Sequence, residues 1–296
     1  MNGFWKLTNY LFGWMMQKRG MIVLIASLAF GTVGMLIRSF PKAAAKGDIT
    51  HLAESFLPYE MIVDKSCVVG VFLLGLLLLF LIIYLTANQF FTNGKGIYTI
   101  LMLPVKRSHI YFAFFAASLA MIVLYFATWL MLMVVLYFPV MANYTRVAAA
   151  EVFRVSDSVI VQALDATRVN GLYLAFRRSS FLLSCFPSSL WQALALVSGL
   201  MLTVVSVLYG ALHVGDKGGQ VMVMLIGIVM GVSTAMISWV NINELSFSFG
   251  YIVSGVFGIA SAETTIGTTL IYCIPTVSMI VLLMHLSLKD MKKKIV

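Results

Sequence analysis

The sequence predicts an all-α polytopic membrane protein with six transmembrane helices in one transmembrane domain, residues 1–296. Of the 296 residues, 61% are hydrophobic and 10% are charged, and the mean hydropathy is +0.99. Soluble domains are only about half apolar. The apolar residues also gather in runs of the length that a bilayer core requires, roughly 20 residues of helix. Short basic segments separate these runs, as expected for loops on the cytoplasmic side.

The N-terminal segment, residues 1–19, is predicted to be an amphipathic elbow helix in the membrane interface. Its apolar residues recur at three- and four-residue steps, which gives the helix one apolar face. This face comprises Phe4, Leu7, Leu11, Trp14 and Met15. Lys18 and Arg19 then hold the start of the first span on the cytoplasmic side.

The six spans are predicted at residues 20–37, 67–87, 111–138, 190–212, 221–240 and 265–285. The third span is long enough to tilt or to project beyond the bilayer, and Pro139 is expected to close it. Pro275 is expected to kink the sixth span. Between spans 5 and 6, the apolar residues 251–262 are too few to cross a bilayer and favour a re-entrant or interfacial element.

The longest polar segment, residues 139–189, is predicted to be extracytoplasmic. Its stretch 147–174 alternates charged and apolar residues, which fits one or two amphipathic helices on the outer surface. The segments assigned to the inside carry all of the net charge of +9, whereas those assigned to the outside hold equal numbers of basic and acidic residues. We therefore expect both termini in the cytoplasm of a bacterial cell, with the chain in the plasma membrane.

A polar island at residues 88–110 divides the second and third apolar runs. Gly94, Lys95 and Gly96 interrupt the backbone, and residues 97–103 have the spacing of a short helix that ends before Pro104. The basic residues that follow complement the carbonyl end of that helix. The segment is predicted to be a cytoplasmic coupling helix.

This island resembles the loop between spans 2 and 3 of type-two ATP-binding-cassette (ABC) membrane permeases, through Leu103, Pro104, Val105 and Arg107. The family commonly has an acidic residue at the head of this helix and a lysine at the start of the next span. Here residues 90–109 contain no Asp or Glu, and the span opens with Tyr111, Phe112 and Phe114.

The resemblance implies a separate ABC ATPase subunit that binds ATP and Mg, a second transmembrane subunit, identical or related, and no cofactor in this chain. The implied ATPase-coupling residues are Gly94, Lys95, Gly96, Tyr98, Leu101, Leu103, Pro104, Val105, Lys106 and Arg107.

The chain lacks the sequence signals of its own energy source. No ionisable residue lies in the middle of a proposed span, where ion-coupled carriers place theirs. Gly94-Lys95 and Lys217-Gly218 lack the spacing of a phosphate-binding loop, and no hydrolase motif is present. We therefore expect no enzymatic activity in this chain. Its basic residues are spread over short loops, which argues against a nucleic-acid partner and for the lipid bilayer.

Adaptable side chains in two spans, and two acidic residues beside the re-entrant element, are candidates for a substrate pathway or gate. They are Met131, Met133, Tyr137, Met230, Met236, Glu244 and Glu263. Ordinary packing or lipid contact for the first five, and solvated loop charges for the glutamates, are the alternatives.

The histidines and cysteines show no metal-ligand spacing. His51, His109, His213 and His285 are predicted to be polar loop or interface residues. Cys67, Cys185 and Cys273 are read as small buried residues, although a bridge between Cys67 and Cys185 is an open alternative.

Together these features predict the transmembrane subunit of an ABC exporter that moves a hydrophobic or amphipathic substrate out of the cell. A membrane-active peptide, a drug or a lipid-like molecule would suit spans without charge, and the corresponding role is peptide export or drug and antimicrobial resistance. The alternatives are a non-transporting membrane sensor or scaffold, and an ion-coupled carrier.

Overall fold

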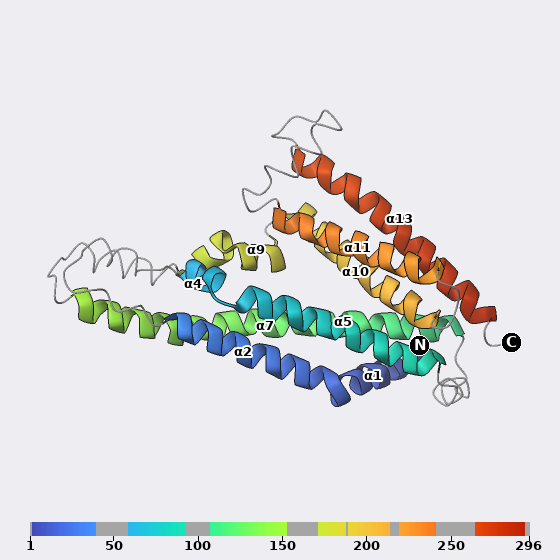
Figure 1. The fold of residues 1–296 in the computed structure, drawn as a ribbon, viewed down its shortest axis with the longest axis horizontal. Coiled ribbons are helices and arrows are strands. Elements are labelled where there is room, and N and C mark those ends of the chain that lie inside the picture. Colours follow the sequence, from blue (N-terminus) through green and yellow to red (C-terminus); the bar gives the residue numbers. More distant parts are fainter. Residues whose placement is uncertain are drawn as a thin grey trace. The chain divides into compact units, whose positions relative to one another are not determined.

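The computed structural model describes residues 2–39, 59–92, 107–152, 171–187, 189–213, 219–240 and 264–293, and this part of the chain is helical without a strand (Figure 1). The helices are α1 (Asn2–Met15), the π-helical turn η1 (Met16–Gly20), α2 (Met21–Ser39), α4 (Tyr59–Lys65), α5 (Val68–Thr92), α7 (Arg107–Val152), α9 (Ser180–Cys185), α10 (Leu190–Leu212), α11 (Gly219–Val240) and α13 (Thr264–Lys293). Residues 171–178 are helical as well. The predicted all-α class is confirmed.

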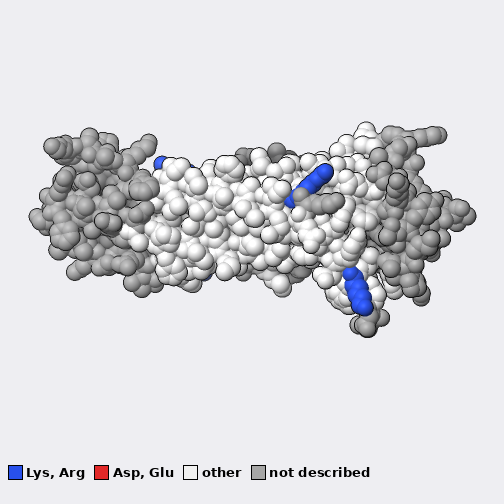
Figure 2. Space-filling view, turned by 90° about the horizontal axis from the view of Figure 1, so that it is seen from below, with Lys and Arg blue, Asp and Glu red and all other residues white. Residues whose placement is uncertain are grey.

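Five of the described helices are long and apolar enough to cross a membrane: Met21–Ser39, Val68–Phe91, Ser108–Ala142, Leu190–Leu212 and Thr269–Met291. In α11, the described stretch Gln220–Ala235 is also apolar but is shorter than these five helices. Figure 2 shows one face on which the described surface is uncharged apart from a few Lys and Arg side chains. These features indicate a multi-pass membrane protein. That the chain has six spans remains a prediction, and the predicted re-entrant element, residues 251–262, lies outside the described residues.

The prediction that Pro139 closes the third span is wrong, because α7 continues through this proline to Val152. Proline removes one helical hydrogen bond and crowds the preceding turn, at a cost of about 3 kcal/mol. Buried side chains on both sides offset that cost: Tyr137 precedes the proline, and Val140 and Met141 follow it. Residues 139–152 are therefore helix, and the predicted outer amphipathic helices lie mostly at 153–170, outside the described residues.

Backbone contacts divide the chain into two compact units. Unit 1 comprises Met1–Val23, Leu76–Leu124 and Pro187–Val296, and unit 2 comprises Leu24–Gly75 and Tyr125–Phe186. Helices α5 and α7 each contribute one part to each unit. The units are described separately below.

An aromatic cluster around Phe72 forms the core of unit 2. Its ring contacts those of Tyr125, Trp129 and Phe181 at centroid distances of 5.3, 5.6 and 5.3 Å. The Tyr125 hydroxyl donates to the Phe72 carbonyl oxygen at 2.9 Å, so the polar end of this ring is satisfied inside the core. Helix α2 approaches closely at Gly31, where an added Cβ would lie 2.5 Å from the Trp129 ring. Such aromatic pairs contribute about 0.5–1.5 kcal/mol each beyond burial.

Helix α4 is fastened to α7 and α9 within the same unit. The Tyr59 hydroxyl donates to the Met133 carbonyl oxygen at 2.7 Å, and burial raises the pKa of Tyr59 above its usual value. The Asp64 carboxylate accepts hydrogen bonds at the start of α9 from Ser179 Oγ at 2.7 Å, from the Ser180 N–H at 2.9 Å and from the Phe181 N–H at 3.1 Å. A carboxylate at a helix N-terminus satisfies amide groups that have no partner within the helix.

The three cysteines are free thiols, so no bridge joins Cys67 to Cys185. The prediction of small buried residues is confirmed for Cys185, whereas Cys67 is exposed and Cys273 is half-buried. Burial raises the pKa of the Cys185 thiol to about 12, against a smaller lowering by the hydrogen bond with Ser184. Cys185 is therefore protonated at neutral pH.

Helices α10, α11 and α13 pack side by side in unit 1 (Figure 1). The α10–α11 contact is built from small residues, since a Cβ on Gly199 would lie 2.5 Å from the Gly231 carbonyl oxygen and 2.6 Å from the Ala235 nitrogen. Close backbone approach at small residues is the usual basis of helix packing inside a membrane. Between α11 and α13, the Thr234 and Thr276 hydroxyls share a hydrogen bond of 2.9 Å.

Helix α1 has the apolar face that the sequence predicts. Leu7, Leu11 and Met15 are buried, whereas Lys6 and Asn9 on the other side are exposed. The amphipathic pattern therefore places one face of α1 against the rest of unit 1.

Candidate functional site

The predicted coupling segment lies between two described helix ends. Helix α5 ends at Thr92, and α7 begins at Arg107, the last residue of the motif. The other predicted coupling residues lie outside the described residues: Gly94, Lys95, Gly96, Tyr98, Leu101, Leu103, Pro104, Val105 and Lys106. What the structure supplies is the setting of this segment in unit 1.

An aromatic bracket, Trp14, Phe90, Phe91 and Phe114, joins the helix ends on either side of the segment. The Phe114 ring contacts those of Phe90 and Phe91 at 5.3 and 5.1 Å, which joins the start of α7 to the end of α5. Trp14 of α1 contacts Phe90 edge to face at 4.9 Å. Since Phe114 is fully buried, the bracket fixes where residues 93–106 leave α5 and enter α7.

Helix α1 also reaches the first turn of α7. The Phe4 ring meets the His109 ring edge to face at a centroid distance of 6.2 Å. Helix α1 therefore contacts both helices that flank the coupling segment, through Trp14 on α5 and through Phe4 on α7. The sequence signal for these ring contacts is the group of aromatic residues at the start of α7, Tyr111, Phe112 and Phe114, which lies outside the Leu103–Arg107 motif.

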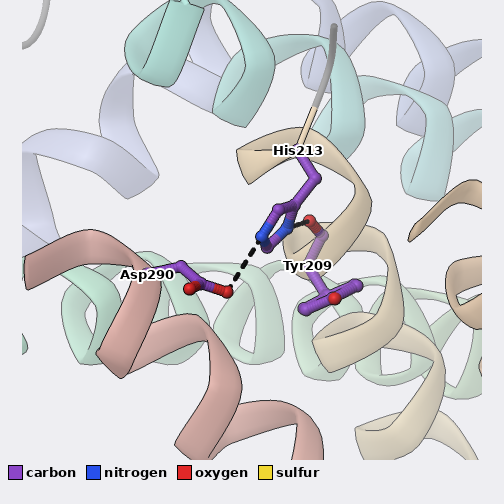
Figure 3. A network of polar contacts seen from close by, with 3 residues as sticks. All are labelled: Tyr209, His213 and Asp290. Atoms are coloured by element: carbon purple, nitrogen blue, oxygen red, sulfur yellow. Dashed lines mark hydrogen bonds and ion pairs between the residues drawn. The ribbon is translucent and has the colours of Figure 1, made fainter. Parts of the chain in front are cut away.

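A polar pair ties the end of α10 to α13. His213 Nε2 lies 3.1 Å from Asp290 Oδ2, and His213 Nδ1 lies 2.9 Å from the Tyr209 carbonyl oxygen (Figure 3). The His213 side chain is 3% exposed and that of Asp290 is 28% exposed. His213 follows the last residue of α10 and is a polar residue in a turn, as predicted, but its side chain is buried against α13.

Two buried hydroxyls lie beside this pair. Tyr111, in the first turns of α7, faces Ser287 of α13, which is one turn before Asp290. Both hydroxyls are fully buried, and their geometry does not form a hydrogen bond. The start of α7, the end of α10 and the end of α13 thus meet at one end of unit 1.

The candidate pathway residues on α7 do not share one face. Met131 is 69% exposed, whereas Met133 and Tyr137 are buried in unit 2. The Tyr137 ring packs edge to face on Tyr59 at 5.0 Å. For Met133 and Tyr137, these contacts are those of an ordinary core.

The remaining pathway candidates belong to unit 1. Met230 packs against the buried cluster of Leu202, Val205, Tyr209 and Leu283. Met236 lies on α11, while Glu244 and Glu263 fall outside the described residues. The described residues therefore do not assemble these candidates into one pathway.

No family model, curated protein or solved structure matches this chain. Within the described residues, no group of three or more His, Cys, Asp or Glu is placed to hold a metal ion.

Proposed function

We propose that this chain is the transmembrane subunit of an ABC exporter, coupled through residues 94–107 to a separate ATPase subunit. The observation that carries the proposal is the Leu103-Pro104-Val105-x-Arg107 motif, which runs directly into the start of α7. The aromatic bracket supports it, because a segment that transmits force needs ends that are held in place.

The mechanism follows from this setting. ATP-driven closure of the motor subunits pushes on residues 94–107, and the bracket passes that movement to α5, α7 and α1. The two-subunit membrane assembly then shifts its population between inward and outward states. The spans contain no ionisable residue in their middle, which favours a hydrophobic or amphipathic substrate such as a membrane-active peptide.

Copurification from the native membrane tests the docking assignment. We expect the wild-type chain to retain an ATPase subunit, and the Leu103→Asp and Arg107→Glu variants to lose it at least about tenfold, measured as co-eluting ATP hydrolysis. Lys65→Ala, an exposed change in unit 2, is the control and retains it. Retention of the ATPase by both motif variants would show that the segment is not the docking site.

Two alanine variants of neighbouring rings on α7 test the role of the aromatic bracket. Phe114→Ala removes two ring contacts to α5, worth about 1 kcal/mol each, and is expected to weaken ATPase retention by up to about 30-fold. Phe112→Ala removes an exposed ring two residues away that contacts neither bracket residue on α5, and is expected to leave retention unchanged. Equal effects of the two variants would refute the role of the bracket.

A further inference from the structure

The apolar face of helix α1 is covered by protein and is therefore not available to lipid. Leu7, Leu11 and Met15 on this face are 4%, 0% and 1% exposed. An amphipathic helix that lies on a membrane by its apolar face keeps that face free for the acyl chains. Any contact between α1 and the membrane therefore comes from the opposite face of the helix.

This opposite face, the outward face of α1, carries aromatic and cationic side chains. Trp5 and Tyr10 are 62% and 57% exposed. Lys6 and Asn9 lie on the same side of the helix and are exposed too. Further along this side, a Cβ added to Gly13 would meet no atom within 4 Å. The described residues therefore leave the outward face uncovered.

Ring contacts fix the Trp5 side chain in its exposed position. Its ring meets that of Phe4 edge to face at a centroid distance of 5.5 Å, and Phe4 in turn meets His109 of α7 at 6.2 Å. An exposed indole combines a large apolar ring with one N–H donor. Both parts are satisfied at the level of the lipid headgroups, where Trp and Tyr are enriched in membrane proteins.

The charge of this region indicates which lipids it attracts. Helix α1 and the turn η1 contain Lys6, Lys18 and Arg19 and no Asp or Glu, and the first acidic residue of the chain is Asp48. The Lys6 and Arg19 side chains are exposed. Only the five residues of η1 separate α1 from the apolar helix α2, so these charges lie close to the membrane surface. Basic residues at that depth attract anionic headgroups.

We propose that the outward face of α1, formed by Trp5, Lys6, Asn9 and Tyr10, is a docking surface for anionic phospholipid headgroups. The two rings lie at headgroup level, and Lys6 between them pairs with a lipid phosphate. A soluble protein subunit is the competing occupant, but the short connection to α2 favours lipid. This docking surface stands independently of the exporter assignment.

Fluorescence quenching by brominated lipids tests which lipid surrounds Trp5. The purified full chain is reconstituted in bilayers with equal shares of phosphatidylcholine and phosphatidylglycerol, and either one or the other lipid is brominated. Because the chain has 5 tryptophans, the Trp5 signal is taken as the difference between the wild type and Trp5→Phe. We expect phosphatidylglycerol to exceed phosphatidylcholine around Trp5 by at least about fivefold, the effect of one basic residue at an anionic surface.

Substitutions of Lys6 separate its charge from the position of α1. Lys6→Gln is expected to lower the excess of phosphatidylglycerol by about fivefold. Lys6→Arg keeps the positive charge and is expected to retain the excess. Lys65→Gln, an exposed change on α4 in unit 2, is the control and is expected to leave the excess unchanged.

Two results would overturn the proposal. Equal quenching of Trp5 by the two brominated lipids would show that the outward face does not select anionic headgroups. The absence of quenching by either lipid would show that this face points away from the bilayer, as expected of a site for a soluble protein. The measurement needs no ATPase subunit, so its outcome is separate from that of the copurification test.

Discussion

The Asp64 contact with α9 makes a quantitative prediction, because a single side chain supplies three hydrogen bonds to the start of that helix. Hydrogen bonds to a charged group contribute about 1.5–3 kcal/mol each when buried. Asp64 is half-buried, so water replaces part of the loss, and we expect Asp64→Ala to weaken the attachment of α9 by about 2–4 kcal/mol. That free energy raises the fraction of molecules with α9 detached by about 30- to 700-fold.

The buried thiol of Cys185, at the end of α9, reports this detachment. In a chain with Cys67→Ser and Cys273→Ser, maleimide can react only with Cys185, and only when α9 opens. The pKa of this thiol is about 12 in the folded state, so labelling at pH 7.5 proceeds through the open state. The labelling rate should therefore rise with Asp64→Ala by the same factor of about 30 to 700.

Two further variants make the test specific. Asp64→Asn keeps an oxygen acceptor without the charge and is expected to give an intermediate rate. Lys65→Ala removes an exposed neighbour and is expected to leave the rate within about threefold of the parent, as exposed surface changes do. A labelling rate that Asp64→Ala leaves unchanged would show that the Asp64 hydrogen bonds do not hold α9 in place.

Two close contacts at glycine residues give further predictions, both measured as the midpoint of unfolding in detergent. Gly31→Ala places a methyl group 2.5 Å from the Trp129 ring and is expected to destabilise unit 2 by about 1–3 kcal/mol. Gly70→Ala, with open space around the residue, is the control and is expected to be neutral or stabilising, and equal midpoints for the two variants would contradict the close contact between Gly31 and Trp129. Gly231→Ala places a methyl group 2.8 Å from the Gly199 carbonyl oxygen, so it is expected to push α10 and α11 apart and to destabilise unit 1 by about 1–3 kcal/mol. An unchanged midpoint of unfolding would show that the two backbones do not approach so closely.

The helices were predictable because a membrane span depends on the residues of its own segment, which form one long apolar run. Residues 190–212, predicted as the fourth span, are the bounds of α10, and the predicted apolar face of α1 is the buried one. The period of the apolar residues and the length of each run suffice for such assignments. The end of α7 was missed because Pro139 is a local stop signal, and the packing that overrides it comes from side chains on both sides of the proline.

The setting of the candidate site and the polar contacts between helices were less predictable, because these contacts join distant parts of the chain. His213 lies 77 residues before Asp290, and Asp64 lies 115 residues before Ser179. Each of these residues sits in a polar stretch that reads as an ordinary loop or helix end. The motif at Leu103 to Arg107 identified the segment to consider, but it carried no information about the rings of α1 and α5 beside it.

The positions of the polar contacts in unit 1 reflect the free-energy cost of burying a charged group. Along the apolar length of α10, the hydroxyls of Thr203 and Ser206 donate to carbonyl oxygens of their own helix, at 2.9 and 2.8 Å. An ion pair in that position would need compensation for losing its hydration, whereas a hydroxyl bonded to its own backbone needs none. The His213–Asp290 pair instead lies at the helix ends, where Asp290 keeps partial contact with solvent.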